Sequence, residues 1–310
     1  MNRPNLAIDL CGIALKNPVI AASGTCAYGI EMDGLLDWDQ VGGIVVKGLS
    51  REPMPGNAPP RLWETRAGMM NSIGLQNIGV RAFVTQKLPL LAQLPVAVFA
   101  NVFGYSLEDY GEVVRVLEEA PGLAGYELNV SCPNTSHGGI YFSSDPTILS
   151  ELVSSVVRLS RRPIIVKLSP NVASIQPLAR AAEDAGAAAV SLVNTFLALA
   201  VDARTRQPRI GAGFGGLSGP AIKPIALRLV YEAAQSVRIP VIGLGGIASG
   251  EDAAEFLIAG ASAVQVGTAS FADPGAVARV ARQLGDFVQQ QGIAAVRDLV
   301  GTLDMGESKK

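Results

Sequence analysis

Eight short apolar runs recur along the chain, and a stretch with helical features follows each of them. The runs are rich in Val, Ile, Leu and Ala, and they cover residues 18–22, 43–47, 96–100, 124–130, 163–167, 188–193, 240–244 and 263–266. Short apolar runs that alternate with helices are typical of buried parallel strands. Eight such units without an intervening linker predict an α/β fold, a single (β/α)8 barrel over residues 1–310. A doubly wound sheet is the alternative fold.

The segments that interrupt this alternation carry their own predictions. Residues 6–15 predict a small β-hairpin that plugs one end of the barrel, and residues 31–38 predict a helix. Residues 50–78 are rich in Pro and Gly and too long for a simple connector, so we expect a functional insertion. Residues 211–216 read GAGFGG and match a dinucleotide fingerprint, but they do not open directly from a strand. We interpret this glycine-rich stretch as a mobile loop.

Charge and cysteine content exclude several classes of protein. The chain has 25 basic and 27 acidic residues and no basic block, which argues against a nucleic-acid surface. The most membrane-like window, residues 186–201, is short and interrupted by polar residues, so we expect a strand and a loop there and no membrane partner. The three cysteines, Cys11, Cys26 and Cys132, lack metal-ligand spacing and cannot all pair. A reduced, cytoplasmic protein without a bound metal is therefore expected.

Polar residues and glycines gather where the predicted strands end. In a (β/α)8 barrel the active site forms at these carboxyl ends. In chain order, the ends carry Ser23; Lys47; Asn101; Asn129 with Cys132; Lys167; Asn194 with Thr195; Gly245-Gly246; and Gly267-Thr268. Eight such ends in one barrel predict a single polar site at its mouth.

The glycine pairs on the last two predicted strands indicate a phosphate site. Backbone amides at Gly245-Gly246 and Gly267-Thr268 can form an anion cradle, and the helix that follows Ser249 adds its positive amino-terminal end. Either pair alone is typical of an ordinary tight turn. Both together, on strands seven and eight, favour bound phosphate.

Lysines and carboxamides at the same mouth favour a planar, electron-accepting ligand. Lys47 and Lys167 end two β-branched runs and suit a group that accumulates negative charge, as a flavin does on reduction. Carboxamides can match the donors and acceptors of a heterocyclic amide, although each one alone is typical of a turn. The candidates are Asn71, Asn129, Asn134 and Asn194.

Cys132 is the candidate for proton transfer. It lies at a strand exit between Ser131 and Pro133, which argues against an inert core role. An unperturbed thiol has a pKa of about 8.5, so activity that depends on the thiolate should rise with pH. His137 is the only histidine and would allow a Cys–His nucleophile, but no acid that could orient it is evident.

Seven blocks of the sequence resemble the dihydroorotate dehydrogenases, from the first hairpin to the last helix. They are MMNSIGLQN (69–77), ELNVSCPN (127–134), VKLSPN (166–171), SLVNT (191–195), GGLSGPAIKP (215–224), GLGGI (243–247) and GASAVQVGTA (260–269). A Cys rather than a Ser in the catalytic loop is the mark of class 1 of this family. The NTSHGG and LSPN blocks are most similar to class 1B, the catalytic subunit of the NAD-linked form.

This resemblance implies FMN-dependent oxidation of (S)-dihydroorotate to orotate in de novo pyrimidine (UMP) biosynthesis. It implies that Cys132 is the general base that removes the C5 proton while a hydride passes from C6 to flavin N5. The implied FMN contacts are Ser23, Lys47, Gly48, Asn101, Asn129, Lys167, Val193, Gly219, Gly245, Gly246, Gly267 and Thr268. The implied substrate contacts are Lys47, Asn71, Ser72, Ile73, Gly74, Leu75, Asn129, Asn134, Asn194 and Thr195.

The resemblance also implies partners. Electrons would pass to NAD through a second subunit that carries FAD and a [2Fe–2S] cluster, in a heterotetramer built on a homodimer. Three scattered cysteines cannot supply four cluster ligands, so one FMN is the cofactor expected in this chain. We also expect an apolar surface near the flavin edge in the isolated chain.

Three other functions remain open from the sequence. The first is a class 1A enzyme, a homodimer that reduces fumarate without a partner. The second is a flavoprotein similar to dihydropyrimidine dehydrogenase or to the dihydrouridine reductases. The third is a phosphate-binding barrel without redox chemistry, such as an aldolase-like lyase.

Overall fold

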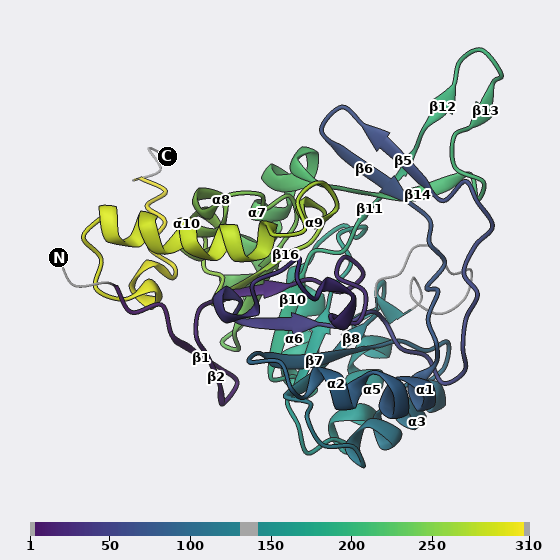
Figure 1. Cartoon of the computed structure of the whole chain (residues 1–310), viewed down its shortest axis with the longest axis horizontal. Coiled ribbons are helices and arrows are strands. Elements are labelled where there is room, and N and C mark those ends of the chain that lie inside the picture. Colours follow the sequence, from purple (N-terminus) through teal and green to yellow (C-terminus); the bar gives the residue numbers. More distant parts are fainter. Residues whose placement is uncertain (1–3, 131–141, 307–310) are drawn as a thin grey trace.

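A closed parallel barrel forms the centre of the structure, a computed structural model that describes residues 4–130 and 142–306 (Figure 1). Its strands pair in the order β10–β15–β16–β3–β4–β7–β8–β9. They are β3 (Val19–Ala21), β4 (Gly43–Val45), β7 (Ala97–Val102), β8 (Gly125–Asn129), β9 (Ile164–Lys167), β10 (Ala189–Leu192), β15 (Val241–Leu244) and β16 (Ala263–Val266). Closure confirms the predicted (β/α)8 barrel and excludes the doubly wound sheet, which is open.

Helices with apolar inner faces surround the barrel. In α10 the buried residues include Val277, Val280, Leu284 and Val288, which recur at helical spacing, and α10 packs on α8 (Figure 1). The helices are α1 (Val80–Gln86), α2 (Leu88–Leu91), α3 (Leu107–Glu118), α5 (Pro146–Val157), α6 (Gln176–Asp184), α7 (Lys223–Ala234), α8 (Gly250–Ile258), α9 (Ala269–Ala272) and α10 (Ala276–Gln290), with 3-10 turns η3 (Pro220–Ile222) and η4 (Val296–Leu299). Within the described residues, no helix combines the length and the apolar character needed to cross a membrane.

The helix predicted over residues 31–38 is wrong. This segment holds two 3-10 turns, η1 (Ile30–Met32) and η2 (Trp38–Gln40). Asp33 is extended after the first turn and Gly34 has a φ of 69°, so the helical path cannot continue. The Asp37 carboxylate then accepts a hydrogen bond from the amide of Asp39 and starts the second turn.

A hairpin closes the amino end of the barrel, as the sequence predicted. Strands β1 (Ile8–Leu10) and β2 (Ile13–Leu15) pair antiparallel. Leu10 and Leu15 are buried in one cluster with inward-facing strand residues such as Phe99. The Cys11 thiol donates to the Ala188 carbonyl oxygen at 3.2 Å. The hairpin therefore covers the amino end of the barrel interior.

The barrel interior has an apolar layer and a polar layer. Every second residue of a strand faces inward. Next to the hairpin these residues are Ile20, Val45, Phe99, Ile165, Ala189, Ile242 and Ala263. Two positions further along their strands, the inward residues include Asn101, Glu127, Lys167, Ser191 and Gln265, which are all buried. The change from apolar to polar side chains occurs one layer below the carboxyl end of the barrel.

A second sheet projects beyond the carboxyl end of the barrel (Figure 1). Its antiparallel strands are β5 (Leu62–Thr65), β6 (Gly68–Asn71), β11 (Phe196–Leu199) and β14 (Phe214–Ser218), in the order β11–β14–β6–β5. The short strands β12 (Val201–Asp202) and β13 (Gln207–Pro208) extend it as a ribbon. The predicted insertion over residues 50–78 thus forms half of a sheet, and the loop after β10 forms the other half.

The interpretation of residues 211–216 as a loop is therefore wrong in part, because Phe214 begins strand β14. Gly216 pairs with Asn71 on one side and Leu197 on the other. A Cβ atom at Gly216 would lie 2.0 Å from Thr195 Oγ1. Close packing explains this glycine, and the strand does not form a dinucleotide-binding turn.

Candidate active site

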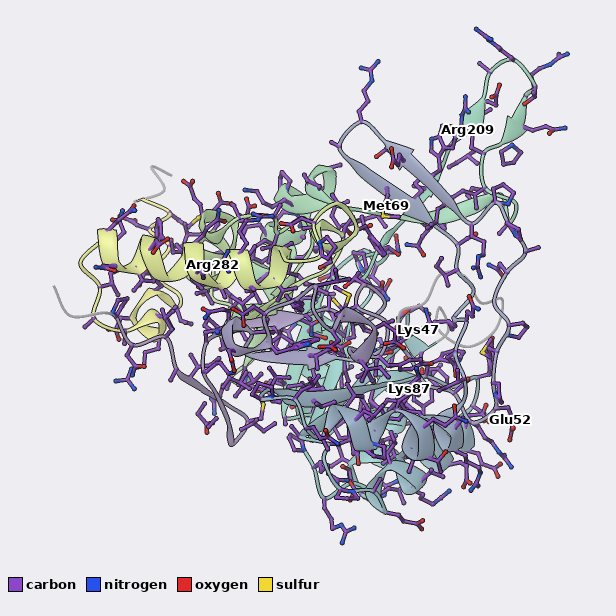
Figure 2. The ribbon with its side chains drawn as sticks, in the orientation of Figure 1. Lys47, Glu52, Met69, Lys87, Arg209 and Arg282 are labelled. Carbon is purple, nitrogen blue, oxygen red and sulfur yellow. The ribbon has the colours of Figure 1, made fainter. Side chains whose placement is uncertain are left out.

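A cavity of about 1400 Å³ lies between the carboxyl end of the barrel and the projecting sheet. All eight barrel strands, or the turns that directly follow them, contribute residues to its wall. Figure 2 shows Lys47 at the barrel and Met69 on the sheet, and both line this cavity. The sheet therefore acts as a partial roof over the strand ends.

The structure brings most of the predicted site residues together. The described ones that line the cavity are Ser23, Lys47, Gly48, Asn71, Ile73, Gly74, Leu75, Asn101, Asn129, Lys167, Val193, Asn194, Thr195, Gly219, Gly245, Gly246, Gly267 and Thr268. Ser72 is the exception, because it is fully buried beside the cavity wall and its amide donates to the Arg61 carbonyl. Cys132, Asn134 and His137 lie in residues 131–141, outside the described part of the chain.

Two cationic side chains stand at one side of the cavity. Lys47 follows β4, and Arg61 precedes β5 and donates to Gln76 Oε1 at 2.9 Å. Burial, and then the positive charge of Arg61, lowers the pKa of Lys47 below its usual value. A bound anion would offset both effects, so this corner favours a negatively charged group.

Glycines shape the part of the cavity wall that follows β15. Gly245 and Gly246 follow β15 with φ values of 129° and 82°. A Cβ atom at Gly246 would lie 2.8 Å from Lys223 Cβ and 2.9 Å from the Gly219 carbonyl oxygen. Close packing therefore excludes a side chain at this turn, and its backbone lines the cavity, an arrangement that can bind phosphate through amides.

The amides at the start of α8 are bonded within the chain. Ser249 Oγ accepts from the amide of Asp252 at 3.1 Å, and Asp252 Oδ2 accepts from the amides of Ala248 and Ser249 at 2.9 Å each. The amide of Gly250 donates to Gln283 Oε1 at 3.0 Å. An anion in the cavity would therefore contact the glycine turns directly, while α8 contributes its dipole.

Two asparagines form a pair at the ends of β8 and β10. Asn194 Nδ2 donates to Asn129 Oδ1 at 3.3 Å, and the Asn129 carbonyl accepts from the Tyr110 hydroxyl at 2.8 Å. Tyr110 belongs to α3 and is fully buried, so it fixes the last residue of β8. The third carboxamide, Asn71, donates to the Gly216 carbonyl at 3.4 Å. These amides present complementary donors and acceptors to a planar heterocycle.

A buried carboxylate below the cavity was not identified as a site residue from the sequence. Glu127 accepts hydrogen bonds from Asn101, Ser191 and Gln265, and it forms an ion pair with Lys167. The sequence did contain an indication, because Glu127 and Asn129 are two residues apart on one strand and must share its inner face. Gln265, which interrupts the apolar run of β16, is the second missed residue and lines the cavity.

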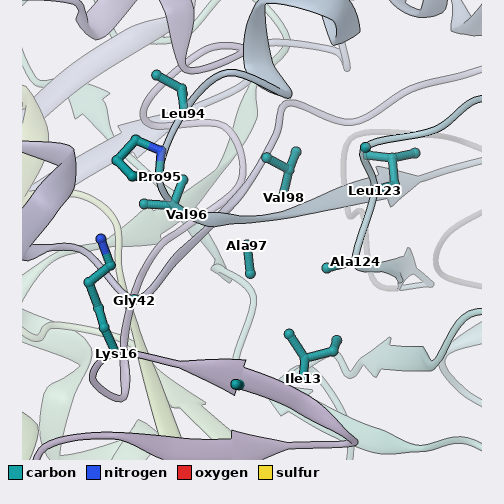
Figure 3. A pocket seen from close by; sticks show the side chains of 12 residues that line it. Ile13, Lys16, Gly42, Leu94, Pro95, Val96, Ala97, Val98, Leu123 and Ala124 are labelled. Atoms are coloured by element: carbon teal, nitrogen blue, oxygen red, sulfur yellow. The ribbon is translucent and has the colours of Figure 1, made fainter.

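A second, smaller cavity lies at the amino end of the barrel (Figure 3). It has a volume of about 560 Å³, and its wall comes from the hairpin, the start of β7 and the segment before β8. Lys16 is the one charged residue in the described wall, and its ammonium donates to the Trp38 carbonyl at 3.3 Å. This cavity offers little chemistry compared with the one at the carboxyl end.

Comparisons with known proteins agree with the geometry. Residues 5–288 match the family described as dihydroorotate dehydrogenase. A Solibacter usitatus protein provisionally named dihydroorotate dehydrogenase A (fumarate) is 71% identical over 97% of this chain and 99% of its own length. The dihydroorotate dehydrogenase B (NAD(+)) catalytic subunit of Geotalea uraniireducens is 49% identical over 98% of this chain and 99% of its own length. The subunit of the same name from Geobacter sp. strain M21 is 48% identical over 98% of this chain and 100% of its own length. The chain belongs to the dihydroorotate dehydrogenase family.

Proposed function

We propose that this protein oxidises (S)-dihydroorotate to orotate with one bound FMN, as a step of pyrimidine nucleotide synthesis. The observation that carries the proposal is the single cavity into which all eight barrel strands bring their polar ends. Its glycine turns suit a phosphate, its carboxamides suit a pyrimidine ring, and its cationic corner suits a carboxylate. The proposed setting is the cytoplasm, where free thiols stay reduced.

The residues of the cavity fit FMN. The Asn101 Oδ1 and Gln265 Oε1 atoms are buried and have no partner among the described residues, although both side chains line the cavity. Unpaired buried acceptors are rare in proteins, so two of them at one cavity wall fit a bound ligand that carries hydrogen-bond donors. The turn at Gly245-Gly246 would take the phosphate, with Gly267 and Thr268 beside it. The other proposed FMN contacts are Ser23, Lys47, Gly48, Asn129, Lys167, Val193 and Gly219.

Bound FMN supplies the acceptor for the hydride that leaves C6 of dihydroorotate. The chain supplies the rest of the chemistry. Lys167, which is 5% exposed at the cavity wall, favours negative charge on the reduced cofactor. Cys132 takes the C5 proton as a thiolate, because a thiol with an ordinary pKa of about 8.5 is partly ionised near neutral pH, whereas a hydroxyl is not.

The substrate is held by contacts from three sides in this proposal. Lys47 and the backbone of residues 71–75 bind its carboxylate, which needs a cation and amide donors. Asn129 and Asn194, with Asn134 of the neighbouring segment, pair with the ring amides. Thr195, which is held through its carbonyl by Asn171 Nδ2 at 3.0 Å, closes the same side.

The proposed electron acceptor is NAD, reached through a partner subunit that carries FAD and a [2Fe–2S] cluster. Leu197, Leu199 and Phe214 are each about half exposed on the projecting sheet. By strand register they lie on the same face as Asn71, which lines the cavity. An apolar surface that continues from the cavity wall supports a protein partner near the flavin. The alternative is a homodimer that reduces fumarate.

Flavin reduction tests this function. The purified chain should be yellow, and stopped-flow mixing with dihydroorotate under anaerobic conditions should bleach the flavin absorbance. A colourless protein would favour a barrel without redox chemistry. Reduction by NADPH with uracil as the oxidant would favour the dihydropyrimidine type. Fumarate, NAD and a quinone are then offered to the reduced enzyme, and rapid turnover with fumarate by the chain alone would assign the homodimeric class.

A further inference from the structure

The inner polar layer of the barrel is organised around one carboxylate. The Glu127 side chain is 0% exposed. Its Oε1 atom accepts from Asn101 Nδ2 at 2.8 Å and lies 3.5 Å from Lys167 Nζ. Its Oε2 atom accepts from Ser191 Oγ at 2.9 Å and from Gln265 Nε2 at 2.7 Å. Each of these four contacts is to a donor, which is the environment of an ionised carboxylate.

Glu127 shares a layer with residues of the cavity wall but does not itself line the cavity. Asn101, Lys167 and Gln265 belong to the cavity wall, whereas Glu127 and Ser191 do not. The carboxylate therefore has no direct access to a ligand in the cavity. Any influence on the ligand passes through the three neighbours that line the wall.

An ionised carboxylate determines which atoms of these neighbouring side chains face it and which face away. Because it can only accept hydrogen bonds, the amides of Asn101 and Gln265 must turn their NH2 groups toward it. Their carbonyl oxygens then point away from Glu127, and both are buried without a hydrogen-bond partner among the described residues. The same charge holds the Lys167 ammonium within 3.5 Å.

A purely structural role would not require this arrangement. Barrel interiors are normally filled by branched apolar side chains, and a buried ion pair is often no more stabilising than apolar residues of similar volume. The layer directly below shows that this barrel can be filled in the usual way, with Ile165, Ile242 and Phe99. A charge placed only in the layer next to the cavity points to the ligand.

We propose that Glu127 is a positioning residue of the cofactor site, which fixes the Lys167 ammonium and orients Asn101 and Gln265 so that one cation and two acceptors face the flavin. The inference rests on the proposed function. It assigns Gln265 to the cofactor site as well. It also implies that the negative charge of Glu127 partly offsets Lys167 and holds the flavin potential below the value that a free lysine would give.

Glu127→Gln tests the proposal with little change of shape. The new amide oxygen can still accept from Asn101 and Lys167. Its NH2 group would face Ser191, whose hydroxyl can accept, and Gln265, whose unpaired oxygen becomes an acceptor when the amide flips. Loss of the negative charge should favour reduced over oxidised FMN about tenfold, which raises the midpoint potential by about 30 mV for a two-electron couple.

The matched control is Glu118→Gln. Glu118 is also largely buried, and it pairs with Arg161 at 3.0 Å and Arg162 at 3.4 Å, away from the residues that line the cavity. Both variants lose a carboxylate with hydrogen-bonded partners, but only Glu127→Gln should shift the potential. A potential equal to that of the wild type in Glu127→Gln, with FMN bound, would overturn the proposal.

Glu127→Asp tests the positioning role of Glu127 if Glu127→Gln does not fold. The shorter side chain keeps the charge but cannot reach all four donors, so FMN affinity of the apoprotein, measured by flavin fluorescence, should fall about tenfold, as for a lost charge-assisted hydrogen bond. Unchanged affinity and potential would again overturn the proposal. If the wild-type chain itself binds no FMN, the proposed function fails; if it is reduced by dihydroorotate while both Glu127 variants match it, only this inference fails.

Discussion

At the scale of single residues, the proposal assigns proton transfer to Cys132 and stabilisation of the negative charge on the reduced flavin to Lys167. Cys132→Ser should keep bound FMN, because most of the proposed flavin contacts come from strands other than β8. Dihydroorotate-driven flavin reduction should slow by ~10²–10⁴-fold at neutral pH, since a hydroxyl is a much weaker base. Stopped-flow absorbance measures this rate. Reduction at the wild-type rate would remove Cys132 from the mechanism.

Lys47 gives substrate binding a defined pH dependence. Its pKa lies below the usual value because of burial and of Arg61, so it loses its proton before an exposed lysine does. Orotate affinity should therefore fall as pH rises through this lowered pKa. Lys47→Gln should weaken orotate binding about 10- to 100-fold at pH 7, as expected for a lost charge-assisted contact.

The pH dependence is measured from the flavin spectrum during orotate titration. A Cys132→Ser background removes the thiol, whose own alkaline titration would otherwise contribute to the pH dependence. In that background the alkaline loss of affinity should disappear when Lys47→Gln is added. An unchanged loss would assign the titration to another group.

At the scale of elements, the turn after β15 requires glycine at position 246, because of its backbone conformation and because of its close neighbours. Gly246→Ala places a Cβ atom at a φ of 82° and within 2.9 Å of two neighbours, one of them the Gly219 carbonyl. We expect FMN to be lost on desalting, together with a lower melting temperature. Gly292→Ala is the control, because Gly292 has a φ of 69° but nothing within 4 Å of its Cβ position.

Both glycine variants should lose about 1–2 kcal/mol of stability from the left-handed backbone. Only Gly246→Ala should also lose affinity for FMN. Equal FMN retention in the two variants would place the phosphate elsewhere in the cavity.

The elements differ in how far the sequence could predict them. The barrel strands were predictable, because each is a short apolar run and the alternation with helices is regular. Residues 31–38 were not, because Gly34 and the Asp37 cap outweigh the helical pattern. The sequence could not show why β14 contains glycines. They are needed because the strand packs closely against Thr195 and Asn71, which are distant in sequence. Glu127 was missed because its role depends on donors from four other strands.

At the scale of the whole molecule, the cofactor should contribute to the stability of the barrel. We predicted one domain, and such a barrel should unfold in a single transition. Removal of FMN should lower the melting temperature, since a ligand at 100 times its Kd adds about 2.7 kcal/mol, which is roughly 4 °C for a chain of this length. Calorimetry of the holoprotein and apoprotein checks both statements. Two separate transitions, with only one sensitive to FMN, would contradict the single domain.

The pairing of β6 with β14 joins two segments that belong to different βα units. The close approach at Gly68, where a Cβ atom would lie 2.0 Å from the Ser218 carbonyl oxygen, leaves no tolerance for a change of register. The two segments therefore form one unit for evolution and for engineering. A loop grafted from a relative after β4 would need its companion after β10 to come with it, because either one alone would meet a mismatched edge.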